Sequence, residues 1–409
     1  MNLHNLLVCR DILDDEIIKG IDAIISGESN DKGQVASLLL GKAETLGLSG
    51  NIIKSYVVYL LAHNETPLTL AIEKANGAIG NSLKYAYYQD FEIVDKLLNL
   101  KPSVLLECTL LDDYEPTKRN SSVAFNYLLN NLNEASDSKS KAEAFIDYYK
   151  RYGYGDMADY RAFFWDHEQM QLAGIKYFEA MKLDDLIGYE YQKEMLLANT
   201  KAFVENKPAN NVLLVGARGT GKSSGVKAVV NDFFAEGLRL VQLTKEQLIY
   251  LPQIMQSLRN FSSKKFIIFL DDLSFEEFEV EYKYLKSAIE GGASAKPDNV
   301  LIYATSNRRH LIKESYKDRG ANDDDMHRAD TLNETISLSD RFGLILYYLA
   351  PNQQEYLDIV KALLAQNGIF LSEEDLRVKA GAWEKEHSGR SGRIAQQFVN
   401  HYLGQLADE

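Results

Sequence analysis

Cysteine and long apolar runs are both scarce in this sequence. Cys9 and Cys108 are the only cysteines among 409 residues, and they lack the spacing of metal ligands, which argues against a disulfide framework or a zinc site. The most apolar early stretch, NIIKSYVVYLLAHN, is interrupted by Lys54 and is too short to span a bilayer. The N-terminus also lacks the basic and then apolar pattern of a secretion signal. These absences predict a reduced, cytoplasmic protein with no membrane association.

Acidic residues outnumber basic ones along the whole chain. The net charge is −14, with 18 basic and 26 acidic residues in 1–183 and 27 and 33 in the remainder. Neither part is an obvious module for binding a polyanion. The charge balance therefore argues against nucleic acid as the main partner, although a local basic patch remains compatible with it.

The chain is too long for one ordinary core, and its pattern changes twice. Residues 1–183 carry apolar residues at three- and four-residue spacing, which predicts a mostly helical N-terminal domain. This part ends in a connector, YYKRYGYGDMADYRAFFWD, that we expect to pack on its neighbours rather than to bind a ligand. Residues 184–350 alternate short apolar runs with helical patterns, as in an α/β core with a buried parallel sheet. Residues 351–409 are again helical.

A complete phosphate-binding motif, GARGTGKS, lies between the apolar run NVLLV and the helical pattern KSSGVKAVVNDFF. Glycines allow backbone N–H groups to wrap around phosphate oxygens, and the helix N-terminus adds partial positive charge. We expect Lys222 to reach the β- and γ-phosphates and the Ser223 hydroxyl to ligate Mg²⁺. The alternative is a chance glycine loop. The predicted nucleotide contacts of this motif are Gly216, Gly219, Thr220, Gly221, Lys222, Ser223 and the adjoining Ser224.

The apolar run FIIFLDD ends in two aspartates about fifty residues further on. Asp271 is expected to hold Mg²⁺ through water, as a Walker B aspartate does. Asp272 stands where a water-polarising carboxylate belongs, but it is one methylene shorter than the usual glutamate. The Asp272 carboxylate can still accept a proton or orient the attacking water, but it would do so from a greater distance unless the backbone shifts. The alternative makes Asp272 the N-cap of a helix that starts near FEEFEVEYKYLKS.

A third apolar run, NVLIYATSN, ends in Asn307. An amide in this position orients the attacking water or senses the γ-phosphate, and the alternative is an ordinary turn residue. Arg308, Arg309 and His310 follow directly. They are expected either to reach a phosphate, DNA or a neighbouring subunit, or to be solvated surface charge.

Further arginines lie where a γ-phosphate would need them. Arg341 precedes the last apolar run and would act across a subunit boundary. Arg390 or Arg393, at the start of a C-terminal helix, would act within the chain, and Arg393 is preferred because it lies in the first helical turn. The alternative for each arginine is a surface salt bridge.

The stretch SYKDRGANDDDMHRADTLNETIS, residues 315–337, contains three consecutive aspartates and matches no motif. A surface loop or a partner contact is the default interpretation. The alternative is a metal site made by Asp323, Asp324, Asp325 and His327.

The ordered set LDDLIGYE, GARGTGKS, FIIFLDD, YATSN, SDRFG and SGRSGR resembles the AAA+ ATPases. The longer phrases PANNVLLVGARGTGKSS, FLDDLSFEEFEVEYKYLKSAIEGG and PDNVLIYATSNRRHLI resemble, more narrowly, a bacterial AAA+ family known as a domain of unknown function. This resemblance runs from about Tyr148 to Leu403. That family also ends its Walker B strand in Asp-Asp, as do some replication initiators and helicase-loader-like proteins, so the second aspartate does not indicate an inactive site.

The resemblance implies a five-stranded parallel core, a helical lid and oligomers that place the nucleotide between subunits. It also implies a role for six positions: Ile187 and Gly188 near the adenine, Asp271 as the Walker B aspartate, Asn307 as the sensor-1 residue, Arg341 as the arginine finger and Arg393 as the sensor-2 residue.

These patterns predict an ATPase that binds Mg-ATP between core and lid and hydrolyses the β–γ bond. Hydrolysis would drive the remodelling of an unknown protein partner through the N-terminal domain. One alternative is a nucleotide-dependent switch or scaffold with little turnover. Another is a DNA-associated loader. A small-molecule kinase is disfavoured because the chain has a sensor-1 asparagine and a helical lid with its own arginines.

Overall fold

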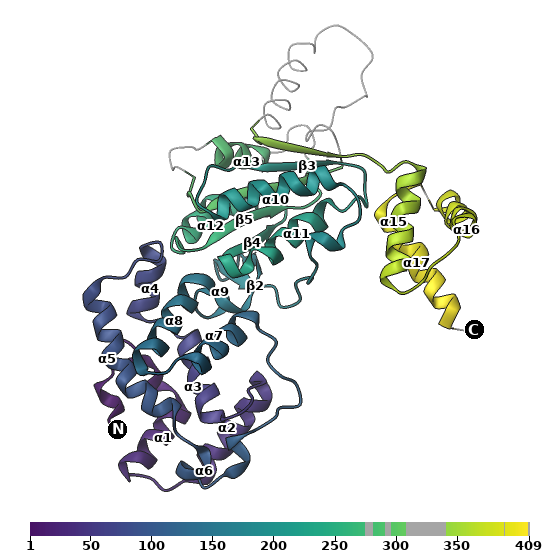
Figure 1. The fold of residues 1–409 in the computed structure, drawn as a ribbon. Coiled ribbons are helices and arrows are strands. Elements are labelled where there is room, and N and C mark those ends of the chain that lie inside the picture. The colour runs from purple at the N-terminus through teal and green to yellow at the C-terminus, as the bar shows by residue number, and fades with distance from the viewer. Residues whose placement is uncertain (275–280, 291–295, 308–340, 388, 408–409) are drawn as a thin grey trace.

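The computed structural model describes residues 1–274, 281–290, 296–307, 341–387 and 389–407. Figure 1 shows a block of helices from the N-terminal part of the chain, a helix-covered sheet next to it, and a small group of C-terminal helices beyond the sheet. Among the described residues, no helix has both the length and the apolar character that crossing a bilayer requires.

The N-terminal part is a bundle of short helices. Its elements are η1 (Leu3–Asn5), η2 (Arg10–Asp14), α1 (Glu16–Ser26), α2 (Lys32–Leu46), α3 (Ile52–His63), α4 (Pro67–Lys74), α5 (Asn81–Leu98), α6 (Pro102–Leu105), η3 (Thr109–Asp112), α7 (Val123–Glu134), α8 (Ser138–Tyr152) and α9 (Asp156–Asp159). Side-chain caps begin several of them; Asp15 and Asn51, for example, accept backbone N–H groups at the starts of α1 and α3. Their apolar faces share one core, in which Tyr56, Phe91 and Phe145 are fully buried.

Seven strands form one sheet in the described part of the chain. They are β1 (Ala162–Asp166), β2 (Gln171–Gly174), β3 (Val212–Gly216), β4 (Leu238–Leu243), β5 (Lys265–Leu270), β6 (Val300–Ser306) and β7 (Leu344–Tyr348). Their order is β2-β1-β4-β5-β6-β3-β7, and every neighbouring pair is parallel except the β1–β2 hairpin. The carboxyl ends of β5, β6 and β3 therefore lie side by side at one edge.

The predicted α/β class is confirmed, but the sheet has two strands more than the five expected. β1 lies at the end of the segment predicted to be only a packing connector, and β2 follows that segment within the part predicted to be mostly helical. β1 pairs along β4, which would otherwise be an open edge. The sequence did not predict these strands, because the pairing of β1 with β4 joins distant segments and leaves no mark in local residue spacing.

Helices cover both faces of the sheet (Figure 1). The elements between the strands are η4 (Leu183–Asp185), α10 (Glu190–Val204), α11 (Lys222–Asp232), η5 (Phe234–Glu236), η6 (Glu246–Tyr250), α12 (Leu251–Leu258) and α13 (Glu281–Glu290). Alternate residues of β3 face opposite sides: Leu213 packs in the core with α12 and α13, and Leu214 packs in the core with α10 and α11. This burial of both faces explains the continuous apolar runs in the sequence.

The C-terminal helices are α15 (Gln353–Gln366), α16 (Glu373–Glu386) and α17 (Gly392–Ala407). They have a small apolar core of their own, to which Tyr356, Val360 and Val399 contribute fully buried side chains. We call this group the lid. The predicted division of the chain at residues 183 and 350 into three domains stays a prediction.

Two buried cations join the helical bundle to the sheet. Arg239 of β4 and Lys264, just before β5, are both fully buried. Arg239 donates to the carbonyl of Tyr152 at 3.0 Å, and Lys264 donates to those of Tyr149 and Lys150 at 3.0 and 2.9 Å. These carbonyls belong to the last turn of α8, so the cations satisfy its free acceptors and oppose its dipole.

A single buried carboxylate offsets this charge. Glu73 of α4 is 2% exposed, and its Oε1 lies 3.2 Å from the Lys264 ammonium. Burial lowers the pKa of Lys264 to about 8 and that of Arg239 to about 9, while the negative charge of Glu73 opposes both shifts. Glu73 therefore favours the charged forms of both buried cations.

Glu73→Ala is expected to lower the free energy of unfolding by about 3–5 kcal/mol, because it leaves buried cations without their counter-charge. Urea unfolding at pH 7 measures the loss. Glu65→Ala is the matched control, because Glu65 is exposed and its carboxylate accepts a hydrogen bond from the Tyr154 hydroxyl at 2.8 Å. We expect its cost to stay below about 1 kcal/mol. Equal stability of the two variants would contradict the role of Glu73.

Candidate functional site

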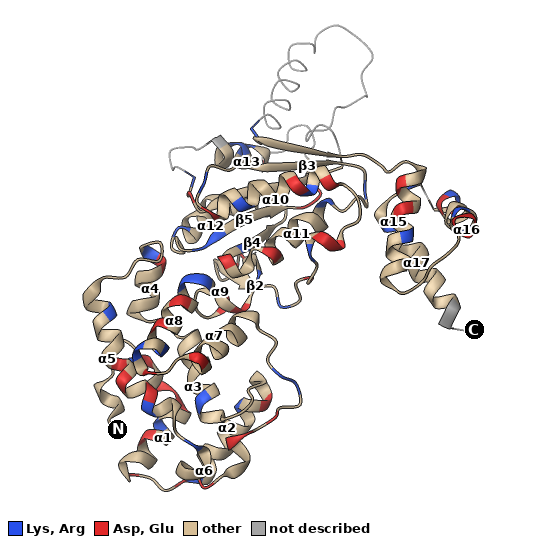
Figure 2. Ribbon diagram, viewed as in Figure 1, with Lys and Arg blue, Asp and Glu red and all other residues tan. Residues whose placement is uncertain are grey.

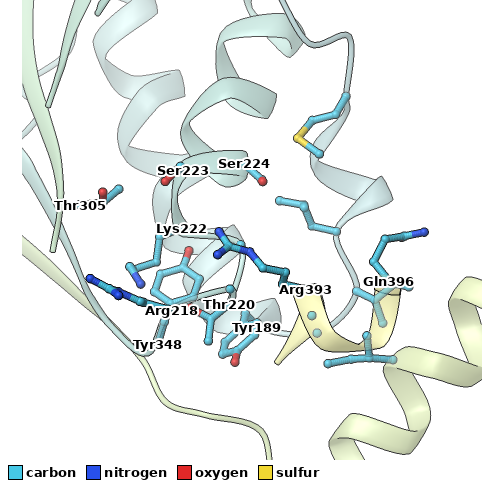
Figure 3. A pocket seen from close by; sticks show the side chains of 18 of the residues that line it. Tyr189, Arg218, Thr220, Lys222, Ser223, Ser224, Thr305, Tyr348, Arg393 and Gln396 are labelled. Atoms are coloured by element: carbon cyan, nitrogen blue, oxygen red, sulfur yellow. The ribbon is translucent and has the colours of Figure 1, made fainter. Parts of the chain in front are cut away.

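Polar side chains from three neighbouring strands meet at the carboxyl edge of the sheet, where they line a cavity of about 730 Å³. The other walls are the β3–α11 loop, the segment before α10, and the lid helices α15 and α17. Figure 3 shows Arg393 extending from α17 toward the residues at the start of α11. The cavity thus lies between the sheet and the lid.

The β3–α11 loop has a backbone that requires glycine. Gly216, Gly219 and Gly221 have φ values of 146°, 74° and 86°, in the region that side chains disfavour. A Cβ at Gly216 would lie 1.9 Å from the carbonyl oxygen of Tyr348, and one at Gly219 would lie 2.9 Å from the Cβ of Arg393. The loop therefore passes tightly between β7 and the lid, and α11 begins directly after it.

Lys222 is the first residue of α11 and is 6% exposed. Its ammonium donates to the carbonyls of Gly216 and Ala217 at 2.9 and 2.6 Å, and to Oδ1 of Asn307 at 3.1 Å. Burial lowers the pKa of Lys222, and the charges of Asp272 and Asp271 oppose that shift. The loop thus folds around a positive charge at the floor of the cavity.

Ser223 and Asp271 meet beside this lysine. The Ser223 hydroxyl donates to Oδ1 of Asp271 at 2.5 Å, and the Thr305 hydroxyl donates to the same oxygen at 2.6 Å. A hydroxyl and a carboxylate are the oxygen ligands that Mg²⁺ prefers. Within the described residues, no group of three or more His, Cys, Asp or Glu side chains forms a metal site.

Asp272 lies on a left-handed turn at the end of β5, with φ 52°. Its N–H donates to the Thr305 hydroxyl at 2.8 Å, and its Oδ1 accepts from the side-chain amide of Asn307 at 2.5 Å. Asn307 therefore bridges Lys222 and Asp272. The capping alternative for Asp272 involves residues 275–280, which lie outside the described residues.

Part of the cavity wall is apolar and aromatic. Ile187, Gly188, Ile359 and Leu363 line it. Tyr189 and Tyr348 pack ring against ring there, with centroids 5.0 Å apart, and the Tyr189 hydroxyl donates to the carbonyl of Leu349 at 2.6 Å. A flat heterocyclic base fits such a surface.

The lid contacts the phosphate-binding loop through the start of α17. The N–H of Arg393 donates to the carbonyl of Gly219 at 3.2 Å, and the Arg393 side chain lines the cavity. Arg390 instead donates to Glu384 within the lid at 2.5 Å. Of the two arginines considered, Arg393 is the one that the fold brings to the cavity.

Comparison with known protein families decides the membership of the chain. The profile described as "Protein of unknown function (DUF815)" matches residues 158–406, more than half of the sequence. The chain belongs to the DUF815 family. In its core the phosphate-binding strand β3 lies inside a largely parallel sheet, and the lid helices line the cavity beside it. No curated protein matches this DUF815 chain.

Solved structures with a similar core include the RuvB Holliday junction branch migration motor of Thermotoga maritima. That match has 19% identity, covers 55% of this chain and 65% of the other, and has a TM-score of 0.37. The FIGL-1 AAA domain in complex with ADP matches at 18% identity over 56% of this chain and 75% of the other, with a TM-score of 0.37. The DUF815 chain thus spans just under two thirds of RuvB, and we infer no substrate or partner from either match.

The fold brings together nearly all the residues predicted for the site. The cavity of this DUF815 protein is lined by Ile187, Gly188, Gly219, Thr220, Gly221, Lys222, Ser223, Ser224, Asp271, Asp272, Asn307 and Arg393. Gly216 lies beneath the loop and contributes a carbonyl to Lys222. Arg341 does not line the cavity of its own chain, because it precedes β7 and lies at the opposite end of the parallel strands.

Several predictions fall outside the described residues. These are the roles of Arg308, Arg309 and His310, and the interpretation of residues 315–337, including the metal site proposed from Asp323, Asp324, Asp325 and His327.

Sequence reasoning missed several side chains that line the cavity, and five of them are labelled in the close-up view. They are Arg218, Tyr189, Thr305, Tyr348 and Gln396 (Figure 3). Arg218 and Thr305 lie within motifs that were recognised, so their positions alone could have suggested them. Tyr189, Tyr348 and Gln396 reach the cavity only because β7, α10 and the lid come together, which no local pattern reveals.

The residues of this DUF815 cavity fit Mg-ATP in three respects. The glycine loop admits no side chain where phosphates would lie, as the close approaches at Gly216 and Gly219 indicate. Ser223 and Asp271 present oxygens that converge to 2.5 Å. Arg218, Lys222 and Arg393 supply positive charge to the cavity, and the paired tyrosines Tyr189 and Tyr348 supply aromatic surface beside the loop (Figure 3).

Proposed function

We propose that this protein is an ATPase that binds Mg-ATP in the cavity between sheet and lid and hydrolyses its β–γ bond. The observation that carries this proposal is the chain of contacts from Lys222 through Asn307 to Asp272. These contacts bring together a cation for binding phosphate, an amide for orienting water and a carboxylate that can act as a base. A site that only binds a nucleotide would need the cation but not the amide and the carboxylate.

We assign ATP binding to the β3–α11 loop and to the apolar and aromatic part of the cavity wall. Backbone N–H groups at the start of α11 and the Lys222 ammonium would hold the phosphates, and the wall around Ile187 and Tyr189 would hold the adenine. Mg²⁺, when bound near Ser223 and Asp271, neutralises phosphate charge and bridges phosphate oxygens.

Hydrolysis is assigned to Asp272 and Asn307, with arginines stabilising the developing charge. Asp272 would accept a proton from the attacking water, or orient it, and Asn307 would hold that water in line. Arg393 would contribute from the lid of the same chain. Arg341, which lies away from its own cavity, would contribute from a neighbouring subunit, so the active form would be a homo-oligomer.

The work that hydrolysis supports is proposed to be the remodelling of a protein partner bound to the N-terminal helices. Arg239 and Lys264 link the end of α8 to β4 and to the start of β5 by hydrogen bonds, so a force applied to the N-terminal helices would be transmitted to these strands. Acidic and basic side chains intermingle over the described helices (Figure 2), and the net charge is −14. A protein partner therefore ranks ahead of nucleic acid, in a cytoplasmic setting.

A nucleotide-dependent switch with little turnover is the second candidate. It is favoured by the bond between Asn307 and Asp272, which occupies the carboxylate that hydrolysis would use. Steady-state phosphate release by purified protein at several protein concentrations separates the two. ATP binding without phosphate release at any concentration would support the switch.

Lys222→Ala is expected to weaken ATP binding about 10- to 100-fold, because a buried charged donor to the phosphates is lost. Titration with a fluorescent ATP analogue measures the affinity. Lys207→Ala is the matched control, because Lys207 is exposed and pairs with Glu205 at 2.6 Å, away from the cavity. Unchanged affinity and turnover in Lys222→Ala would remove the assignment of the loop.

A further inference from the structure

Thr305 links the ends of β5 and β6 at the point where both aspartates lie. It is 2% exposed. Its hydroxyl donates to Oδ1 of Asp271 at 2.6 Å and accepts from the N–H of Asp272 at 2.8 Å. Its carbonyl accepts from the N–H of Leu273 at 2.7 Å. Thr305 thus makes hydrogen bonds to three consecutive residues that directly follow β5, namely Asp271, Asp272 and Leu273.

The first consequence concerns the orientation of the Asp271 carboxylate. Its Oδ1 accepts from the Thr305 hydroxyl, from the Ser223 hydroxyl at 2.5 Å and from the N–H of Asp272 at 3.1 Å. Donors that converge on one oxygen from different directions hold the carboxylate plane against rotation. The Thr305 hydroxyl is the most buried of these side-chain donors, so it loses little to competition from water.

The second consequence concerns the backbone at Asp272. A φ of 52° is unfavourable for most side chains, but aspartate tolerates it better than glutamate does. The turn redirects the Asp272 side chain toward Asn307. Its N–H donates to the Thr305 hydroxyl at 2.8 Å and to Oδ1 of Asp271 at 3.1 Å, so Thr305 supplies the nearer of two acceptors. The left-handed turn thus sets where the shorter carboxylate of Asp272 lies, and the Thr305 hydroxyl contacts that turn.

We infer that Thr305 is a positioning residue for the Asp-Asp pair: its hydroxyl fixes the Asp271 carboxylate and the left-handed turn at Asp272, from which the short side chain acts. This inference rests on the proposed ATPase function. Because the Thr305 hydroxyl is engaged by Asp271 and by the N–H of Asp272, its loss is expected to change the rate of hydrolysis and the gain in affinity from Mg²⁺ more than the affinity for ATP alone.

The test compares Thr305→Val, which keeps the shape but removes the hydroxyl, with Thr305→Ser, which keeps the hydroxyl. Thr305→Val is expected to lower kcat about 10- to 100-fold while KM for ATP changes less than about threefold. Affinity for ATP without Mg²⁺ is expected to match wild type, and the gain in affinity on adding Mg²⁺ is expected to shrink. Thr305→Ser restores both properties.

Thr200→Val is the matched control for a purely structural loss. Thr200 is also fully buried, and its hydroxyl bonds to the carbonyl of Leu196 and to Tyr303, both at 2.8 Å, away from the cavity. It is expected to lower the melting temperature with kcat unchanged. If Thr305→Val does not fold, the comparison of Thr305→Ala with Thr305→Ser decides in its place.

Three results would overturn the inference: wild-type kcat in Thr305→Val, a failure of Thr305→Ser to rescue, or a loss of kcat that Thr200→Val reproduces at equal melting temperature. Absence of turnover in wild type is a different result, because it defeats the proposed ATPase and not the positioning role. In that case the increase in ATP affinity on adding Mg²⁺ still tests Thr305. If Thr305→Val shows the same increase as wild type, Thr305 does not position the Asp271 carboxylate.

Discussion

Arg341→Ala is expected to bind ATP almost normally and to hydrolyse it about 10³- to 10⁵-fold more slowly. Arg341 does not line the cavity of its own chain, so its loss leaves the binding residues intact. It lies before β7, the edge strand of the sheet, where a neighbouring subunit can approach. A guanidinium delivered from that position would stabilise charge on the oxygens of the transferring phosphoryl group.

Mixing Arg341→Ala with Lys222→Ala tests whether the arginine acts across a subunit boundary. Each variant alone lacks a complete site, but a mixed interface pairs the intact loop of the first with the intact arginine of the second. Phosphate release that reappears on mixing and rises with protein concentration is the expected result. Arg119→Ala, an exposed arginine of the N-terminal part that pairs with Glu115, is the control and keeps wild-type turnover.

Two outcomes would contradict the assignment of Arg341. Full activity in Arg341→Ala would make it a structural or surface residue. A mixture that stays inactive although both variants co-assemble would show that the arginine does not act from a neighbouring subunit.

Asp272→Asn is expected to retain ATP binding and to lose at least about 10²-fold in turnover, the contribution of a positioned acid–base group. Asparagine has the same shape and tolerates the left-handed turn, so the backbone at φ 52° is preserved. Only the basic oxygen is lost. Steady-state phosphate release, with ATP affinity measured in parallel, separates catalysis from binding.

The controls for this variant are Asp113→Asn and Asp272→Glu. Asp113 is an exposed aspartate of the N-terminal part, and its amide variant should turn over ATP at the wild-type rate. Asp272→Glu restores the commoner residue but places a longer side chain on a turn that disfavours it. We expect it to be slower than wild type. Wild-type turnover in Asp272→Asn would show that Asp272 is not a catalytic residue.

Much of the core could be predicted because its signals are local. The loop at Gly216–Ser223 is defined by eight consecutive residues whose backbone needs are set by glycine, and its Lys222 and Ser223 lie where the motif predicts. Runs such as FIIFL and VLIYA are apolar throughout because helices cover both faces of the sheet, so short continuous apolar runs between helical patterns indicated the strands. The helical lid followed from its three-residue and four-residue spacing.

The sequence by itself therefore determined the class of fold, the phosphate loop and the identity of the acidic and amide residues at the strand ends. Only the tertiary structure decided how they meet. The hydroxyl of Thr305 reaches two aspartates because β6 pairs with β5, and Arg393 rather than Arg390 reaches the cavity because α17 docks on Gly219. The buried link of Glu73 to Lys264 joins residues far apart in the chain. Such contacts depend on pairing between distant segments, which cannot be predicted from the local spacing of residues.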